Sequence, residues 1–151
     1  MIEIVPYESK YHREFRELNL EWLEKFNLAE SHDLEILDDP EGMVIAEGGC
    51  IFLAMEGGKV VGTAGLYKEN DKEYELVKMA VLPEYRRTGV GKMLLEKCLA
   101  EARLRKGEKV FLYSNSQLQE ALRLYEKYGF REVDILDTRY ITADVKMELT
   151  I

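Results

Sequence analysis

The 151-residue sequence contains few of the residues that build metal centres and disulfide frameworks. It has two cysteines, Cys50 and Cys98, and two histidines, His12 and His32. The cysteines have neither the spacing of a metal site nor the number of a disulfide framework, and the histidines have no partner at ligand spacing. The sequence therefore predicts no metal ion. It also predicts a core thiol at Cys98, which shares a helical face with apolar residues.

Long apolar runs are missing too, since no stretch approaches the roughly 18 apolar residues that cross a membrane. The first residues, Met1–Pro6, lack the basic and then apolar layout of a signal peptide. We therefore expect a cytoplasmic protein that has no membrane contact.

Basic residues are outnumbered, with 21 Lys and Arg against 29 Asp and Glu, so that the formal net charge is −8. This balance argues against general nucleic-acid binding, which requires basic side chains. The segment Glu21–Glu41 alone contains eight acidic residues and one basic residue. It could attract a cationic substrate, although a solvated acidic face is the more common use of a charge run.

The composition, 46% hydrophobic and 33% charged, is typical of a soluble globular protein, and we expect one domain over residues 1–151. Hydrophobic periodicity predicts strands at 2–5, 50–55, 60–67, 74–82, 109–113, 130–136 and 140–149. It predicts helices at 8–26, at 31–37, for roughly 16 residues after Gly91, and at 118–128. Ser31 is the expected N-cap of the second helix, and Gly107 and Gly129 are expected to end the last two. This order predicts an α/β fold with a mixed sheet and helices on both faces.

The most informative stretch is the turn Arg86–Gly91, which lies between an apolar run and a helical pattern. Backbone N–H groups at a helix N-terminus carry partial positive charge and bind phosphate, and glycine removes Cβ atoms that would hold a phosphate away. Two known phosphate loops are excluded, because Arg86 stands where the Walker loop needs its first Gly and Leu94 where the Rossmann turn needs its third. On its own, the turn is equally compatible with a plain strand-to-helix turn that has solvated arginines.

Three pieces of the chain together resemble the GNAT acetyltransferase superfamily, whose members transfer acetyl from acetyl-CoA to amines. Arg86-x-x-Gly89-x-Gly91 is similar to the family pattern (Gln/Arg)-x-x-Gly-x-(Gly/Ala), and Ala121–Phe130 is similar to Ala-x-x-Leu-Tyr-x-x-x-Gly-Phe. Glu75 lies eleven residues before Arg86, where some members carry a catalytic glutamate. The resemblance spans nearly the whole chain. It implies a mixed, mostly antiparallel sheet of six to seven strands flanked by four helices.

The resemblance also implies acetyl-CoA as cosubstrate. The β-strand backbone would pair with the pantetheine arm, the N–H groups of the turn would hold the pyrophosphate, and the basic side chains would add charge. The implied cofactor-binding residues are Met79, Ala80, Val81, Arg86, Arg87, Thr88, Gly89, Val90, Gly91, Lys92, Asn115 and Tyr125. Asn115 stands in this set as a substitute, because Leu118 occupies the place, seven residues before Tyr125, where the family often has Asn.

Three groups are expected to act on the reaction if the resemblance holds. Glu75 would serve as the base, and the Val81 N–H would donate a hydrogen bond to the thioester oxygen. The Tyr125 phenol, with an ordinary pKa of about 10, would serve as the acid toward the CoA sulfur. On a regular strand Glu75, Val77, Met79 and Val81 share one face, where desolvation would make the carboxylate a stronger base. From the residues alone, Glu75 could equally pair with a lysine at a strand edge, and Tyr125 could be a core tyrosine.

The acceptor side is expected between residues 22–40 and residues 137–140. Trp22, Phe26 and Tyr140 could shape a pocket there, and Glu30 or Asp33 could bind an ammonium, although for each residue taken singly a packing or surface role is favoured. The prediction is an N-acetyltransferase in which the primary amine of a small molecule attacks acetyl-CoA directly in a ternary complex. A protein or peptide amine is the alternative acceptor, an acyl-CoA-binding module without turnover is the alternative function, and a homodimer stays open.

Overall fold

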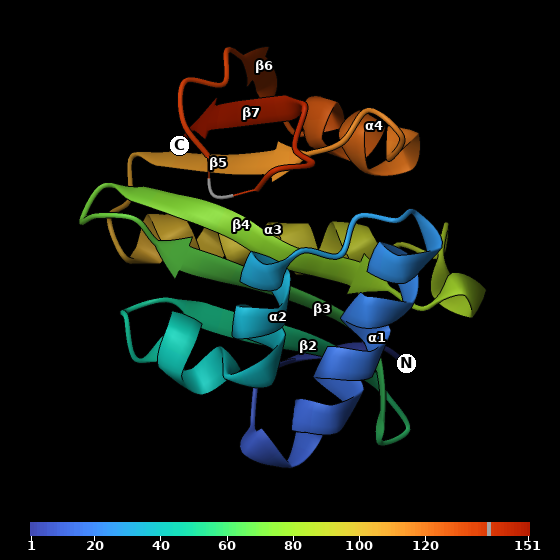
Figure 1. Cartoon of the computed structure of the whole chain (residues 1–151). Helices are drawn as coiled ribbons and strands as arrows, with labels where there is room; N and C mark the ends of the chain where they lie inside the picture. The colour runs from blue at the N-terminus through green and yellow to red at the C-terminus, as the bar shows by residue number, and fades with distance from the viewer. Residues whose placement is uncertain (139) are drawn as a thin grey trace.

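The computed structural model describes residues 1–138 and 140–151 and contains one seven-stranded sheet. The strand order is β1-β2-β3-β4-β5-β7-β6 (Figure 1). Neighbouring strands are antiparallel except β4 and β5, which run parallel. The mixed, mostly antiparallel sheet is therefore confirmed. The strands are β1 (Glu3–Pro6), β2 (Cys50–Glu56), β3 (Lys59–Lys68), β4 (Glu73–Val81), β5 (Lys109–Ser114), β6 (Arg131–Val133) and β7 (Val145–Thr150).

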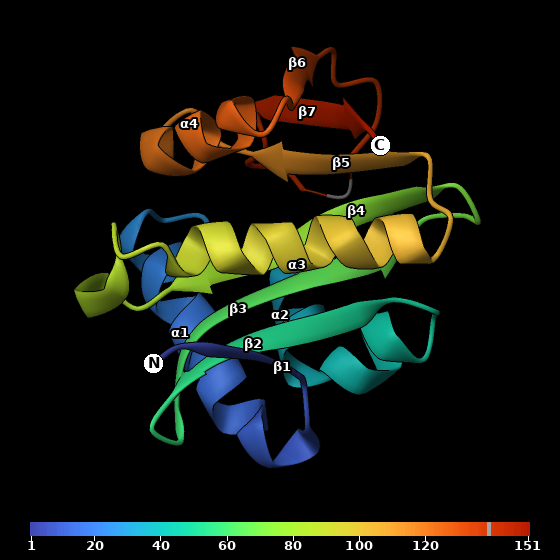
Figure 2. The same ribbon diagram turned by 180° about the vertical axis from the view of Figure 1, so that it is seen from behind.

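Four α-helices flank the sheet, as expected. Figure 1 shows α1 (His12–Lys25) and α2 (Ser31–Asp38) over one face, and Figure 2 shows α3 (Val90–Leu104) across the other. The last helix, α4 (Gln119–Lys127), follows β5 and lies beside β5 and β7. Three short helical turns lie at Ser9–Tyr11, Glu41–Ile45 and Pro83–Tyr85.

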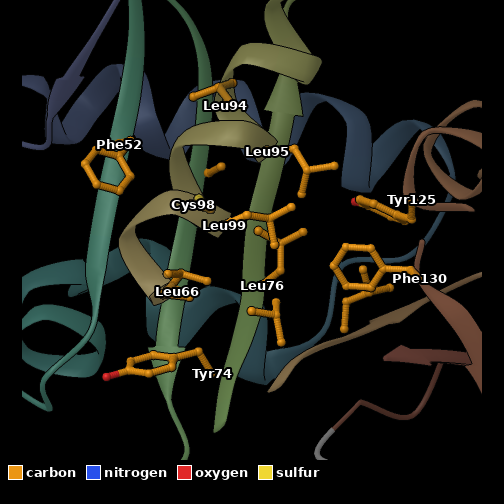
Figure 3. Packing of buried hydrophobic residues seen from close by; sticks show 14 of the residues in the cluster. Phe52, Leu66, Tyr74, Leu76, Leu94, Leu95, Cys98, Leu99, Tyr125 and Phe130 are labelled. Atoms are coloured by element: carbon orange, nitrogen blue, oxygen red, sulfur yellow. The ribbon is translucent and has the colours of Figure 1, made fainter. Parts of the chain in front are cut away.

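Two apolar cores hold these layers together, one on each side of the sheet. The α3 core contains buried residues of β2, β3, β4 and β5 together with Leu94, Leu95, Cys98 and Leu99 of α3 (Figure 3). The second core lies under α1 and α2. Cys98 is fully buried, so the expected core thiol is confirmed, and burial raises the pKa of this thiol.

Two helix ends differ from the expectation. The N-cap of α2 is Glu30 and not Ser31, since the Glu30 N–H donates to the Asp33 carboxylate at 3.0 Å. At the end of α3, Lys106 takes the left-handed conformation expected of Gly107, with φ 64°. Gly129, which follows the C-cap residue Tyr128 of α4, does take this conformation, with φ 96°.

The last two strands are shorter than expected. They cover Arg131–Val133 and Val145–Thr150, and the part of residues 134–144 that the structure describes forms no strand. One reason is that the N–H groups of Ile141 and Thr142 donate to the Glu30 carboxylate instead of a neighbouring strand. The stretch 137–140, expected at the acceptor side, includes residue 139, which lies outside the described residues.

Candidate active site

The candidate site begins where β4 and β5 separate. Their parallel pairing covers Glu73–Glu75 and Lys109–Phe111, after which β4 continues to Val81 and β5 to Ser114 without pairing to each other. A cleft of about 1010 Å³ lies at this divergence. Its walls come from α1, α2, β4, the Arg86–Gly91 turn, β5, the start of α4 and the loop before β7.

A β-bulge in β4 decides which side chains face each part of the cleft. Thr63 pairs with Ala80 and Gly65 pairs with Val77, so two residues of β4, Lys78 and Met79, lie opposite one residue of β3. Lys78 has φ 52°, in the left-handed region that a lysine rarely adopts. The bulge therefore shifts the alternation of every side chain that follows it.

The expectation that Glu75, Val77, Met79 and Val81 share one face is wrong for this reason. Tyr74 and Leu76 belong to the α3 core. Because side chains alternate along a strand, Glu75 and Val77 point to the opposite face, toward α1 and α2. Beyond the bulge, Met79 and Val81 pack against the α3 core. The bulge thus separates Glu75 from Met79 and Val81, which lie on the other face.

Helix α1 anchors the bulge through buried polar groups. The Thr63 hydroxyl donates to the Lys78 carbonyl at 2.7 Å. The Asn19 Nδ2 donates to the Thr63 Oγ1 at 3.0 Å and to the Phe15 carbonyl at 2.9 Å. Asn19 and Thr63 are both fully buried, so these bonds fix the strand without competition from water.

The peptide groups of Val81 point away from β3. The Leu82 N–H donates to the Val61 carbonyl at 2.9 Å, and backbone groups along an antiparallel strand alternate between its two neighbours. The Val81 N–H and C=O are therefore directed toward the side where β5 has diverged. In agreement, the Val81 carbonyl accepts a hydrogen bond from Arg86 Nε at 3.3 Å.

The Arg86–Gly91 turn leads from β4 into α3 and borders the same cleft. Gly89 is the N-cap of α3 and has φ 92°, and an added Cβ there would meet no atom within 4 Å. Glycine is thus required by the backbone angle and leaves open space in front of the helix N-terminus. The Arg87 guanidinium donates to the Glu120 carboxylate at 2.8 and 3.2 Å, which ties the turn to α4 and lowers the pKa of Glu120.

Tyr125 reaches the cleft from α4. It is 7% exposed, and its hydroxyl lies 3.7 Å from the Met79 sulfur. Figure 3 shows its ring, together with that of Phe130, directed toward Leu95 and Leu99 of α3. Burial raises the pKa of Tyr125 above its ordinary value of about 10, so the expected unperturbed phenol is not found.

Glu75 lies on the opposite face of β4 and is only 2% exposed. It also borders the cleft, as Tyr125 does. The structure thus brings both predicted catalytic side chains to one cleft from different sides of the same strand.

Aromatic side chains form part of the cleft wall. Trp22, Phe26 and Tyr140 border the cleft as predicted, and Tyr113 joins them. The Tyr140 ring packs against His32 at 5.0 Å and against Tyr113 at 5.9 Å between ring centroids.

The two acidic residues proposed for this end have different surroundings. The Glu30 carboxylate accepts the N–H groups of Ile141 at 2.6 Å and Thr142 at 2.8 Å. Burial raises the pKa of Glu30, but the hydrogen bonds from Thr142 and Ile141 lower it overall. Glu30 therefore holds a loop rather than bordering the cleft. Asp33 does border the cleft, where it forms a buried ion pair with Lys78, a residue that sequence analysis missed.

Asn115 borders the cleft, but its amide is already engaged. Its Nδ2 donates to the Thr142 carbonyl at 2.8 Å, and its Oδ1 accepts the Gln117 N–H at 3.0 Å. Leu118 occupies the N-cap of α4 and also borders the cleft. The amide of Asn115 thus links the end of β5 to the loop before β7.

Within residues 1–138 and 140–151, no three His, Cys, Asp or Glu side chains are arranged to hold a metal ion. In the same part of the chain, every helix is too short or too polar to cross a membrane.

Comparisons with known proteins agree with this geometry. The model of the acetyltransferase (GNAT) family matches residues 11–130. An uncharacterised N-acetyltransferase of Mycobacterium tuberculosis is 34% identical over 105 residues, which are 70% of this chain and 63% of that protein. The chain thus spans less than two thirds of the length of the first curated relatives that it matches.

Solved structures show the same fold. An acetyltransferase of the GNAT family from Staphylococcus aureus Mu50 has a TM-score of 0.91 at 26% identity, and the match covers 99% of both chains. A GNAT family acetyltransferase from Elizabethkingia anophelis with acetyl-CoA bound has a TM-score of 0.68 at 20% identity, covering 99% of this chain and 98% of that one.

Removing the Thr63 hydroxyl tests whether the buried polar chain stabilises the bulge. In Thr63→Val the shape is kept, but the Lys78 carbonyl loses its donor and Asn19 loses one acceptor. We expect the free energy of unfolding, measured by urea denaturation, to fall by about 1–3 kcal/mol. Thr150→Val, at the exposed end of β7, is the control and should change it by less than about 0.5 kcal/mol. Equal stability of the two variants would contradict this role.

Proposed function

Because the chain belongs to the acetyltransferase (GNAT) family, we propose that it transfers an acetyl group from acetyl-CoA to the primary amine of a small molecule. The observation that carries this proposal is the shared cleft. The diverging strands, the basic turn at the N-terminus of α3, Glu75 and Tyr125 all border it. An acceptor end with aromatic walls supports a small molecule over an exposed protein segment.

The donor end has the chemistry that acetyl-CoA requires. The stretch Met79, Ala80 and Val81 is left unpaired by β5, so its backbone groups that point away from β3, such as the Val81 N–H, would pair with the pantetheine arm. The N–H groups of residues 87–92 would hold the pyrophosphate, because the first N–H groups of α3 have no partner within the helix and Gly89 leaves open space beside them. Arg86, Arg87 and Lys92 add positive charge beside them.

The reaction starts with a neutral amine that attacks the thioester carbon. Glu75 takes the proton that the amine nitrogen loses, directly or through water. The carbonyl oxygen gains negative charge, and the Val81 N–H, directed away from β3, donates a hydrogen bond to it. The carbon–sulfur bond then breaks, which leaves an amide and the CoA thiolate.

Tyr125 acts on the departing sulfur from the other side of β4. A phenol with a raised pKa keeps its proton against a thiolate, whose conjugate acid has an ordinary value of about 8.5. We therefore assign to Tyr125 a hydrogen bond that stabilises the thiolate, and the thiolate takes its proton from water. The Tyr125 hydroxyl lies at the cleft, 3.7 Å from the Met79 sulfur, which supports a contact with a group bound along this end of β4.

Release of free thiol from acetyl-CoA across a panel of amines tests the proposal. Acetyl transfer predicts release well above the rate without amine for at least one small amine. Release with a peptide amine alone would favour a protein acceptor. Tight binding of CoA without release for any amine would favour an acyl-CoA-binding module.

Gly89→Asp tests the pyrophosphate seat. A carboxylate in the open space before α3 would repel the pyrophosphate, so we expect the affinity for CoA, measured by calorimetry, to fall by at least about 100-fold. Gly58→Asp is the matched control, because Gly58 also has a positive φ, 81°, and also has no atom within 4 Å of an added Cβ. CoA affinity that is equal in both variants would place the seat elsewhere.

Glu75→Gln tests the base. The carboxylate is active when deprotonated, so wild-type kcat/KM should fall as the pH drops, and the variant should lose this acidic limb and about 100-fold in kcat. Glu73→Gln, two residues earlier on β4 and outside the cleft, should keep the limb. An acidic limb retained in Glu75→Gln would exclude Glu75 as the base.

Tyr125→Phe tests the group that stabilises the thiolate. We expect kcat to fall by about 10- to 100-fold with KM for acetyl-CoA nearly unchanged, because the hydrogen bond forms only as the sulfur departs. The control is Tyr128→Phe at the C-cap of the same helix, because the Tyr128 hydroxyl donates to the Glu96 carboxylate at 2.8 Å and does not border the cleft. Full activity of Tyr125→Phe under conditions where chemistry limits the rate would rule out the assignment.

A further inference from the structure

A buried ion pair at the acceptor end has no role in the mechanism above. Lys78 Nζ pairs with Asp33 Oδ1, and the two side chains are 6% and 5% exposed. Taking both charges out of water costs several kcal/mol per ion, and packed apolar side chains of similar volume often serve stability equally well. The lysine also adopts a left-handed backbone conformation, which adds to the cost. A contribution to folding stability therefore does not explain why this ion pair is present.

The pair leaves hydrogen-bonding capacity on the lysine. An ammonium has three donors, and among the residues that the structure describes the only acceptor of Lys78 is the Asp33 carboxylate. The centroid of the Tyr140 ring lies 5.5 Å from the ammonium, and the ring face attracts the positive charge. Asp33 is held in place from its other oxygen, which accepts the Glu30 N–H at 3.0 Å. The ammonium is thus fixed and still has donors to give.

The position of the ammonium matches the place of an acceptor. Lys78 and Asp33 border the cleft on the face of β4 that carries Glu75, opposite the face that packs on α3. The aromatic side chains of Trp22, Phe26, Tyr113 and Tyr140 form the surrounding wall. An acceptor here meets carboxylates that attract its amine, an ammonium that attracts an anion, and an apolar surface.

We propose that Lys78 selects the acceptor by binding a carboxylate next to the reacting amine, so that the preferred substrate is an α-amino acid with an apolar side chain. The inference rests on the proposed acetyl transfer and names its substrate class. Asp33 orients the ammonium, Glu75 receives the amine, and the aromatic wall takes the side chain. A peptide N-terminus or a simple alkylamine has no carboxylate next to its amine, so it lacks the interaction with Lys78 and is the poorer substrate.

Three acceptors that differ only beside the amine test the proposal: phenylalanine, phenylalaninamide and phenethylamine. The readout is the ratio of kcat/KM between acceptors, measured by thiol release. In the wild type we expect phenylalanine to exceed phenethylamine by about 10-fold or more, because a charge-assisted hydrogen bond is lost with the carboxylate. In Lys78→Met the ratio should fall to about one, and in Lys78→Arg a preference for phenylalanine should remain.

The outcomes separate this inference from the proposed function. Equal kcat/KM for the three acceptors in the wild type would overturn the role of Lys78 and leave acetyl transfer intact. An unchanged ratio in a folded Lys78→Met would overturn it as well, since a merely structural lysine lowers all three values together. Thiol release that is absent for every amine, in contrast, is a failure of the proposed function itself. If Lys78→Met does not fold, the proposal is tested by the acceptor ratio in the wild type and in Lys78→Arg. A preference for phenylalanine in both supports it, and equal kcat/KM values for the acceptors overturn it.

Discussion

The bulge at Lys78 and Met79 is the constraint on which the rest of the site depends. One extra residue in β4 shifts the alternation of its side chains, so that Glu75 faces α1 and α2 while Met79 and Val81 face α3. The parallel pairing with β5 ends at Glu75, three residues earlier. A single strand thus presents a carboxylate to one side and peptide groups to the opening, which a regular strand with continuous neighbours cannot do.

Holding this bulge requires polar groups inside the protein. The Thr63 hydroxyl of β3 donates to the Lys78 carbonyl and accepts from Asn19 of α1, and Asp33 of α2 pairs with the Lys78 ammonium. A left-handed lysine costs about 1–3 kcal/mol and is retained only when its surroundings fix it. The two helices on this face therefore do more than cover the sheet. They keep β4 in the conformation that the cleft requires.

Features that depend on residues close together in the chain were predicted well from the sequence. Period-two and helical patterns predicted the seven strands, the four helices and their order, and the Arg86–Gly91 turn lies at the N-terminus of α3 as expected. The same patterns could not reveal the bulge, because an inserted residue shifts the alternation without changing the residue types. Placing Glu75 with Met79 and Val81 was wrong for that reason. The shortened final strands have a similar origin, since Glu30 captures peptide N–H groups more than 100 residues away.

The two halves of the cleft differ in how they are encoded. Apart from Tyr125 of α4, the proposed donor half comes from one continuous segment, the end of β4, the turn and the start of α3, so its residues appear in the sequence as a motif with fixed spacing. The acceptor half joins α1, α2, β4 and the loop before β7, and its ion pair connects residues 45 apart. The one local sign of it is Lys78, a charged residue within the apolar run 76–82. A lone charge in a buried strand must find a partner, and here that partner, Asp33, fixes the ammonium at the face where an acceptor would lie.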